Sequence, residues 1–193
     1  MRRDLDTPSD VGWFLSVGVV PRGMLAVVSD THSTDGHRLS GRTLEAVRDA
    51  EIVVHAGDFM RESVLDDFER EAPRLLGVTG NNDDAATRRR LPEARTLTFG
   101  GCTFAVTHTR RGGRTALSLF GRQRDADVVL FGHSHRPTHD PGEDVTLVNP
   151  GSHAQPRGNR AAHAEFESRG DGLDGRLVTV DGEVFEEFVV GDS

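Results

Sequence analysis

The chain has 193 residues, which is enough for one domain with a sizeable buried core and too few for two ordinary domains. Its 23 basic and 31 acidic residues give a net charge of -8, so it has no general basic surface for duplex nucleic acid or anionic lipid. Cys102 is the single cysteine, which excludes an internal disulfide or a thiolate cluster and favours a reducing cytoplasm.

Residues 1–23 differ in composition from the rest of the chain. A charged start leads into a mildly apolar run over 11–20, which contains Trp13, lacks a small-residue cleavage site and is far too short to span a membrane. We expect residues 1–23 to be a disordered tail or an extension ahead of a true start at Met24, and residues 24–193 to form one domain.

From Met24 onward, short apolar runs alternate with amphipathic segments. This alternation is typical of βα units that build a parallel sheet. The predicted elements of this half are strands over 24–29, 51–56 and 74–79 and helices over 40–50 and 61–71.

After about residue 94 the strand-like runs become shorter, and 161–190 alternates around two Asp-Gly pairs, a pattern typical of a β-meander with tight turns. Because strands from both halves must each bury one face, we predict a four-layer α/β/β/α sandwich of two mixed β-sheets flanked by helices. The further predicted elements are strands over 95–99, 102–107, 127–131 and 145–149 and a helix over 113–123.

Polar motifs follow the ends of the predicted strands. In open α/β sheets the loops beyond the carboxyl ends of strands converge on one crevice, where ligands bind. The motifs are Asp30-Thr31-His32, Gly57-Asp58, Gly80-Asn81-Asn82-Asp83, Thr107-His108-Thr109-Arg110 and Gly132-His133-Ser134-His135.

These motifs supply carboxylates, imidazoles and one amide oxygen, which suit divalent ions such as Mn, Fe, Zn, Ni or Mg. An Asp-x-His or His-x-His step on an extended backbone places alternate side chains on one side, so both can reach one site. Gly57, Gly80 and Gly132 allow tight turns and close backbone approach. Taken singly, each motif also fits a turn or a solvated histidine; their ordered occurrence favours a metal site.

The five motifs, spread in order over residues 24–136, resemble those of the calcineurin-like metallophosphoesterases. The segments Asn149-Pro150-Gly151-Ser152 and Gln155-Pro156-Arg157 are similar to a small subfamily of bacterial and archaeal phosphodiesterases, to which the retromer's metallophosphoesterase-like subunit is related. The resemblance implies one ion held by Asp30, His32 and His135, a second held by Asn81, His108 and His133, and Asp58 as the bridge between them.

The resemblance also implies an activity. A hydroxide between the two ions would attack the phosphorus of a small phosphoester, and diesters are the expected substrate class. Mn is the expected metal, with Ni, Fe, Zn or Mg as alternatives. Asp83 would orient a neighbouring imidazole rather than bind a metal itself. The rival interpretation is a weak or inactive scaffold of the same fold that binds protein partners. Nucleic acid and membranes are not expected as partners, and a homo-oligomer is left open.

Two positions depart from the family pattern. Larger relatives have a histidine at the position of Asn82, and an amide cannot act as a general acid at neutral pH. The change therefore favours either substrates with good leaving groups or a metal-bound water as the proton donor. The subfamily tends to have His-Gly-His where this chain has His108-Thr109-Arg110. We predict that Arg110 grips a substrate phosphate, with Arg111 and Arg114 as alternatives.

The remaining histidines are assigned no chemistry. We expect His55 to have a structural hydrogen-bonding role. The others are expected in solvent or at the rim of the pocket: His37, His139, His153 and His163.

Overall fold

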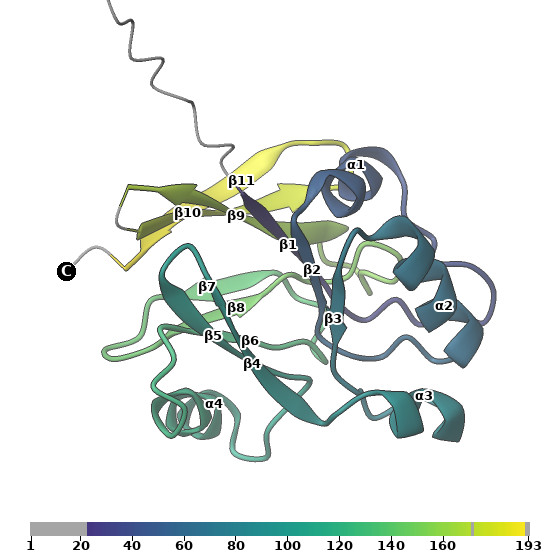
Figure 1. Ribbon diagram of the computed structural model, residues 1–193, viewed down its shortest axis with the longest axis horizontal. Helices are drawn as coiled ribbons and strands as arrows, with labels where there is room; N and C mark the ends of the chain where they lie inside the picture. The colour runs from purple at the N-terminus through teal and green to yellow at the C-terminus, as the bar shows by residue number, and fades with distance from the viewer. Residues whose placement is uncertain (1–22, 171, 192–193) are drawn as a thin grey trace, which may run out of the picture.

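Two β-sheets stacked on one another form the centre of the protein, as the computed structural model shows for residues 23–170 and 172–191 (Figure 1). The first sheet has the strand order β11-β10-β9-β1-β2-β3, and the second has the order β4-β5-β6-β8-β7. The strands of the first sheet are β1 (Met24–Val28), β2 (Ile52–His55), β3 (Leu75–Gly77), β9 (Ala162–Arg169), β10 (Gly172–Thr179) and β11 (Val184–Val190). Those of the second are β4 (Ala94–Phe99), β5 (Cys102–Thr107), β6 (Val128–Leu130), β7 (Thr138–Asp140) and β8 (Thr146–Asn149).

Both sheets are mixed. In the first, β1 runs parallel to β2 and β2 to β3, whereas β1 pairs antiparallel with β9. In the second, β5, β6 and β8 are parallel, and β4 and β7 are antiparallel edge strands. The parallel strands at the centre of each sheet therefore end at a common edge, which is where ligand sites of open α/β sheets lie.

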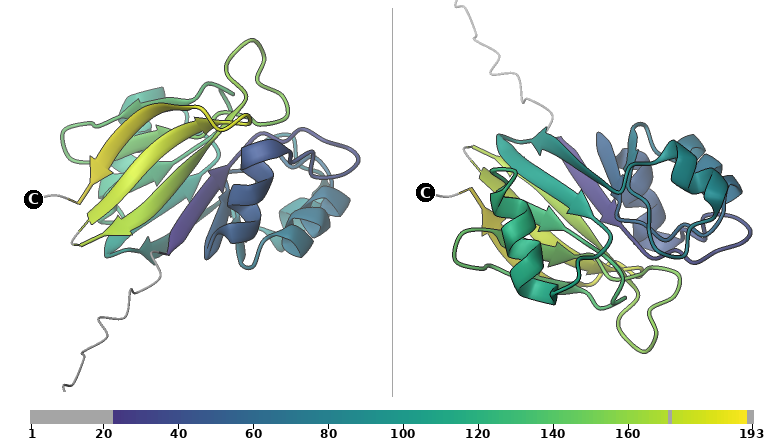
Figure 2. Two further views of the ribbon diagram at one scale, coloured as in Figure 1. Left: turned by 90° about the horizontal axis from the view of Figure 1, so that it is seen from above. Right: turned by 90° about the horizontal axis from the view of Figure 1, so that it is seen from below.

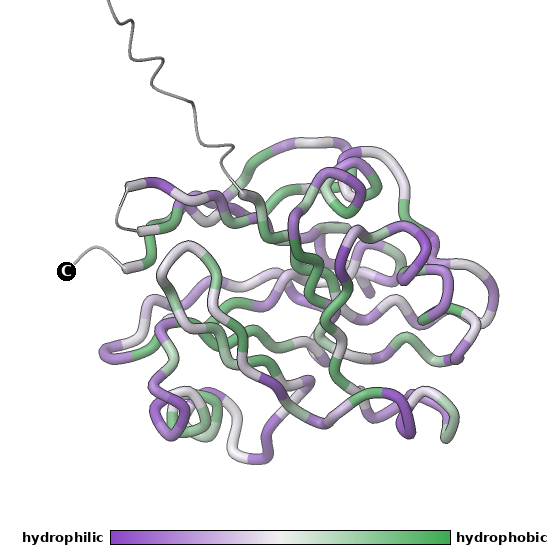
Figure 3. The backbone as a smooth tube through the Cα atoms, viewed as in Figure 1, coloured by the Kyte–Doolittle hydropathy of each residue, from purple (hydrophilic) through white to green (hydrophobic). Residues whose placement is uncertain are grey.

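Alternating side chains of the central strands fill two different layers. Leu25 and Val27 of β1 belong to the core between the sheets, while Ala26 and Val28 face the helices. In the core, the Phe104 ring of the second sheet meets the edge of a phenylalanine of the first at 5.1 Å between ring centroids. Figure 3 shows the apolar strands at the centre and polar segments in the outer loops.

Helices cover the outer faces of the two sheets. The helices are α1 (Gly41–Asp49), α2 (Glu62–Glu71), α3 (Ala85–Arg90) and α4 (Gly113–Arg122). Val47 of α1 and Phe68 of α2 pack on the first sheet, and Leu117 and Phe120 of α4 pack on the second. The two views of Figure 2 place α4 on the far side of the second sheet from β9–β11. The predicted four-layer α/β/β/α sandwich is confirmed.

The predicted strands and helices are present within two residues of their expected bounds. The sequence reading missed α3, which is six residues long and begins at Ala85. The side chain of the preceding Asp84 caps it by accepting from Thr87 N. It also missed β7, a three-residue edge strand that follows Pro137. Elements this short carry too few residues to show a period.

Some predictions fall on residues outside the described ranges. Apart from Gly23, the tail predicted over residues 1–23 lies outside the described residues, and so does Asp171 of the first predicted turn. The second predicted turn is present, with Gly182 at φ 92° between β10 and β11. Among the described helices, none has the length and apolar character needed to cross a membrane.

A buried charge network joins α1 to β9 and β10. The fully buried Glu165 accepts hydrogen bonds from Arg42 Nε at 2.9 Å, Arg176 Nε at 2.7 Å and His163 Nε2 at 2.8 Å. The other ring nitrogen of His163 lies 3.0 Å from the hydroxyl of Thr43. This charge is therefore matched by two guanidinium groups and one imidazole, as buried charges require.

The placement of His163 and His153 in solvent or at the rim was wrong, because both are buried. The Glu165 carboxylate and the Thr43 hydroxyl satisfy the His163 ring, while His153 Nε2 lies 3.1 Å from the carbonyl of His37. Burial lowers the pKa of His153 to about 4, so its ring is neutral at pH 7. His37 and His139 are half-buried.

The charge network predicts a pH-dependent stability. Burial favours a raised pKa for Glu165, but hydrogen bonds from His163 and Arg42 outweigh it and lower the pKa to about 2. A depressed carboxyl pKa stabilises the fold above the unfolded value of about 4.3, and this contribution is lost as the pH falls toward 2. We expect Glu165→Gln to lower the free energy of unfolding in urea by about 3 kcal/mol at pH 7, with the deficit shrinking below pH 4.

Glu187→Gln, on the exposed face of β11, is the matched control and should change stability by less than about 0.5 kcal/mol. A deficit for Glu165→Gln that stayed constant down to pH 3 would contradict this account of the network.

Candidate metal centre

Five loops at the carboxyl ends of strands meet at one edge of the sandwich. Backbone hydrogen bonds extend the β1–β2 pairing into these loops: Asp30 N donates to the carbonyl of Gly57 and His32 N to that of Asp58, both at 3.0 Å. In the second sheet, Gly132 N donates to the carbonyl of His108 at 3.0 Å. Neighbouring loops are thus bonded to each other at the level where their functional side chains emerge.

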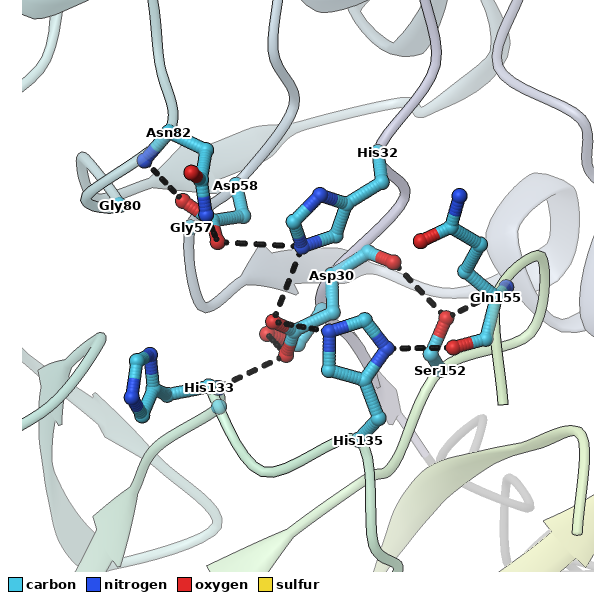
Figure 4. A network of polar contacts seen from close by, with 12 residues as sticks. Asp30, His32, Gly57, Asp58, Gly80, Asn82, His133, His135, Ser152 and Gln155 are labelled. Atoms are coloured by element: carbon cyan, nitrogen blue, oxygen red, sulfur yellow. Dashed lines mark hydrogen bonds and ion pairs between the residues drawn. The ribbon is translucent and has the colours of Figure 1, made fainter. Parts of the chain in front are cut away.

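The first group of candidate ligands consists of Asp30, His32 and His135 (Figure 4). Asp30 Oδ1 lies 3.7 Å from His32 Nε2 and 3.4 Å from His135 Nε2. All three atoms are buried and have no hydrogen-bond partner. Buried polar atoms in folded proteins are nearly always satisfied, so three such atoms facing one another indicate a place for a cation.

The second group consists of Asn81, His108 and His133. Asn81 Oδ1 lies 3.1 Å from His108 Nε2 and 2.9 Å from His133 Nδ1. His133 is exposed, and Figure 4 shows its ring turned away from His32 and His135. The structure therefore brings together the three residues predicted for a second ion, on the side of the site nearer to solvent.

Asp58 lies between the two groups. Its Oδ2 atom is 3.1 Å from His32 Nε2 in the first group and 3.2 Å from His108 Nε2 in the second. Burial favours a raised pKa for this carboxyl, but the imidazoles of His108 and His32 outweigh it and hold the pKa well below its usual range. Asp58 is therefore an anion in the position of a shared ligand.

Two of the histidines have a fixed orientation. His108 Nδ1 donates to the carbonyl of Ala56 at 2.8 Å, and His135 Nδ1 donates to the carbonyl of Gln155. Each of these bonds places a proton on Nδ1 and leaves Nε2 directed at the site, as in metal-bound histidines.

The charges in the site call for a cation. The carboxylates of Asp30 and then Asp58 raise the pKa of His32 to about 9, so this ring carries a proton at pH 7 when it has no other partner. Burial lowers the pKa of His135. The unpartnered atoms and the oxygen and nitrogen donors together fit divalent metal ions, which would take the place of protons among these groups.

The backbone that carries the ligands differs from the expectation. Extended Asp-x-His and His-x-His steps were predicted, but five ligand residues have positive φ angles, between 45° and 71°: Asp30, His32, Asp58, His133 and His135. Left-handed backbone turns each loop inward, so that neighbouring ligands reach the centre from a tight bend instead of from one side of a strand. Non-glycine residues in this region cost about 1–3 kcal/mol each, a cost found mainly at functional sites.

Two glycines leave the space that the carboxylates need. A Cβ atom on Gly80 would lie 2.0 Å from Asp58 Oδ1, and one on Gly132 would lie 2.6 Å from Asp30 Oδ2. The close approach expected of these glycines is confirmed.

Asp83 contacts backbone rather than an imidazole, which corrects the orienting role expected for it. Its two carboxylate oxygens accept from Met60 N at 2.8 Å and Gly80 N at 2.7 Å. Burial raises the pKa of this carboxyl. Asp83 thus ties the loop after β2 to the loop after β3, and so sets the distance between Asp58 and Asn81.

Asn82 has a contact that sequence reasoning missed. Its backbone N donates to Asp58 Oδ1 and its side-chain Nδ2 to Asp58 Oδ2, both at 2.7 Å. The residue that replaces the family's histidine therefore holds the carboxylate between the two ligand groups. The position of Asn82 directly after the candidate ligand Asn81 was the one feature of the sequence that could have indicated this contact.

The end of β8 and the segment after it also support the site. Asn149 Nδ2 donates to the carbonyl of Gly132, and the Ser152 hydroxyl donates to the carbonyl of Asp30, both at 2.8 Å. The sequence reading used this segment only as a family signature. The structural role predicted for His55 is confirmed: its fully buried ring lies 2.8 Å from the Thr31 hydroxyl and accepts from Gly57 N.

The three candidate arginines lie in different surroundings. Arg110 lines a cavity of about 430 Å³ together with Asn81 and His108, and its guanidinium lies 4.3 Å over the Phe120 ring. Its Nε atom is buried without a hydrogen-bond partner. Arg114 is paired with Asp140, and Arg111 is exposed. These contacts favour Arg110 among the three as the residue that meets a ligand at the second group.

The fold is that of a metallophosphoesterase. The model of the calcineurin-like phosphoesterase superfamily domain matches residues 24–168, and the chain belongs to this family. The family and the ligand set together indicate divalent metal ions.

Relatives and solved structures agree with this assignment. A probable metallophosphoesterase of Methanothermobacter thermautotrophicus is 32% identical over 160 residues, which cover 80% of this chain and 91% of the relative. A phosphodiesterase of Methanocaldococcus jannaschii is 26% identical over 140 residues, 66% of this chain and 82% of the relative. Vps29 of Entamoeba histolytica, solved in complex with zinc, has the same fold, with a TM-score of 0.69 and 22% identity over 86% of this chain and 98% of that chain.

The shared position of Asp58 predicts how metal content responds to its loss. We expect the protein dialysed against Mn²⁺ to retain about two ions per chain, and Asp58→Ala to retain less than about one, because both groups lose a ligand. Metal content is measured by inductively coupled plasma mass spectrometry. Asp49→Ala, an exposed residue at the end of α1, is the matched control and should keep the wild-type content. Two tightly held ions in Asp58→Ala would contradict the bridging position.

Proposed function

We propose that this chain is a cytoplasmic phosphodiesterase that uses two divalent ions, with Mn²⁺ as the first metal to test. The observation that carries the proposal is the position of Asp58 Oδ2, within 3.2 Å of one histidine from each ligand group. The phosphodiesterase among the relatives supports the reaction type. The single buried Cys102 suits a reducing compartment.

When bound, two divalent ions would supply positive charge to the phosphoryl oxygens and would lower the pKa of a nearby water. Asp30, His32 and His135 would hold one ion, Asn81, His108 and His133 would hold the other, and Asp58 would contact both. The remaining polar residues position these ligands. Asn82 holds Asp58 by two hydrogen bonds, and Asp83 fixes the spacing of the loops that carry Asp58 and Asn81.

The surroundings of Asp58 also bear on the leaving group. The Asn82 amide cannot give up a proton at neutral pH, and its Nδ2 is already engaged with Asp58. We therefore propose substrates whose leaving alkoxide or phenoxide needs little protonation. An activated diester such as bis-p-nitrophenyl phosphate meets this requirement.

Hydrolysis of that diester tests the proposed function. Metal-stripped protein should be inactive, and added Mn²⁺ should restore release of p-nitrophenolate, followed by absorbance. Asp58→Asn should lower the Mn²⁺-supported kcat/KM by about a hundredfold or more, since it removes the shared negative charge. Asp49→Asn is the control and should match the wild type.

The rival function is a scaffold of the same fold that binds protein partners. The likeness in fold to Vps29 is the observation behind it. Absence of turnover with Mn²⁺, Mg²⁺, Zn²⁺, Ni²⁺ and Fe²⁺ would contradict the phosphodiesterase and favour the scaffold.

Arg110 is proposed to grip the substrate phosphate. Its guanidinium is fixed over Phe120, lines the cavity at Asn81 and His108, and has no carboxylate partner among the described residues. We expect Arg110→Ala to raise KM for bis-p-nitrophenyl phosphate by about tenfold, the value of one charge-assisted contact. Arg89→Ala, exposed on α3, is the control. An unchanged KM in Arg110→Ala would exclude the contact.

A further inference from the structure

A second cavity adjoins the candidate metal centre at His133. It has a volume of about 240 Å³ and is lined by His133 on one side and by residues of α4, β7 and β8 on the others. Thr109 and Arg110 line both this cavity and the larger one beside Asn81 and His108. The two cavities therefore meet at the residue proposed to hold the phosphate.

The walls of the second cavity are predominantly apolar. Leu117 of α4, Phe131 after β6 and Leu147 of β8 supply the hydrophobic surface, and Gly113 adds no side chain. Leu117 and Leu147 are almost fully buried, so the cavity reaches down to the apolar layer beneath α4. Such a surface favours an apolar group over a polar or charged one.

Two of the charged residues that line this cavity are matched to each other. Arg114 and Asp140 both line it, and they form a bidentate ion pair in which Arg114 Nη2 lies 2.9 Å from Asp140 Oδ1. Neither charge is left to attract a second ionic group. In the larger cavity, by contrast, Arg88 has no carboxylate partner among the described residues, and its guanidinium donates to the carbonyl of Asn81.

The size of the second cavity suits one ring. An apolar protein cavity of about 150 Å³ is known to hold benzene, so 240 Å³ accommodates a phenyl ring or a single heteroaromatic ring with small substituents. A long acyl chain would extend beyond it. The cavity also starts at His133, whose Nδ1 lies 2.9 Å from Asn81 Oδ1, so an ester group would reach it directly from a phosphate at the second ligand group.

We propose that this cavity is a subsite for one flat aromatic ester group of the substrate phosphate, a proposal that rests on the phosphodiesterase function. The ring lies against Leu117, Phe131 and Leu147, and the phosphate lies at Arg110 and the second ligand group. The other ester group then faces the larger, polar cavity with Arg88. The substrate class is a phosphodiester with one aryl or heteroaromatic group close to the phosphorus.

Two non-hydrolysable probes that differ in one aromatic ring test the subsite by binding alone. Calorimetric titration of the Mn²⁺-loaded protein should show phenylphosphonate binding about tenfold or more tightly than methylphosphonate, as expected for burial of one ring. Thr138→Phe places a ring into the cavity from the edge strand β7 and should reduce this preference to about twofold or less. Thr138→Leu fills less of the space and should give an intermediate preference.

Thr96→Phe is the matched control, because Thr96 is exposed on β4, the opposite edge strand of the same sheet. It should keep the wild-type preference. Equal affinities for the two phosphonates, or a phenyl preference that survives in Thr138→Phe, would overturn the subsite. If Mn²⁺-dependent hydrolysis of bis-p-nitrophenyl phosphate were still observed, the proposed function would be unaffected by that result. A phenyl preference without any hydrolysis would keep the subsite as a ligand site and overturn the phosphodiesterase.

Discussion

The carboxylate of Asp58 lies within 3.2 Å of one imidazole on each side, and much of the surrounding structure holds it there. Asn82 binds it through two hydrogen bonds, and Asp83 ties together the loops on which Asp58 and Asn81 stand. Removing a carboxylate from water is costly unless cations or donors replace the lost hydration. The histidines and amides around Asp58 supply that replacement, and divalent ions would supply it more strongly.

The two stacked sheets hold the ligand residues in an unfavourable conformation. Five of the ligand residues have left-handed backbone, and three buried polar atoms lack hydrogen-bond partners. Loops alone would relax away from such a conformation. Here the loops follow parallel strands, and backbone hydrogen bonds join neighbouring loops across the β1–β2 and β5–β6 pairs. Asn149 and Ser152 donate to the loops that carry Gly132 and Asp30. The rigid double sheet thus sets the separation of the two ligand groups.

The sequence predicted much of the fold because the central strands are apolar runs whose ends carry polar motifs, and parallel strands bring such ends together. It also placed all seven candidate ligands at one site. It did not predict the bends of the ligand loops, since positive φ at Asp30 or His133 depends on tertiary hydrogen bonds that no local pattern records. For the same reason it misplaced His163, whose ring is satisfied in the interior by Glu165 and Thr43. It interpreted Asn82 only as the loss of a general acid and missed its hydrogen bonds to Asp58.

The most direct test of two ligand groups joined by one carboxylate is anomalous X-ray diffraction from crystals grown with Mn²⁺. The account predicts two anomalous peaks, one among Asp30, His32 and His135 and one among Asn81, His108 and His133, with the Asp58 carboxylate in contact with both. A single peak, or two peaks of which only one touches Asp58, would contradict it.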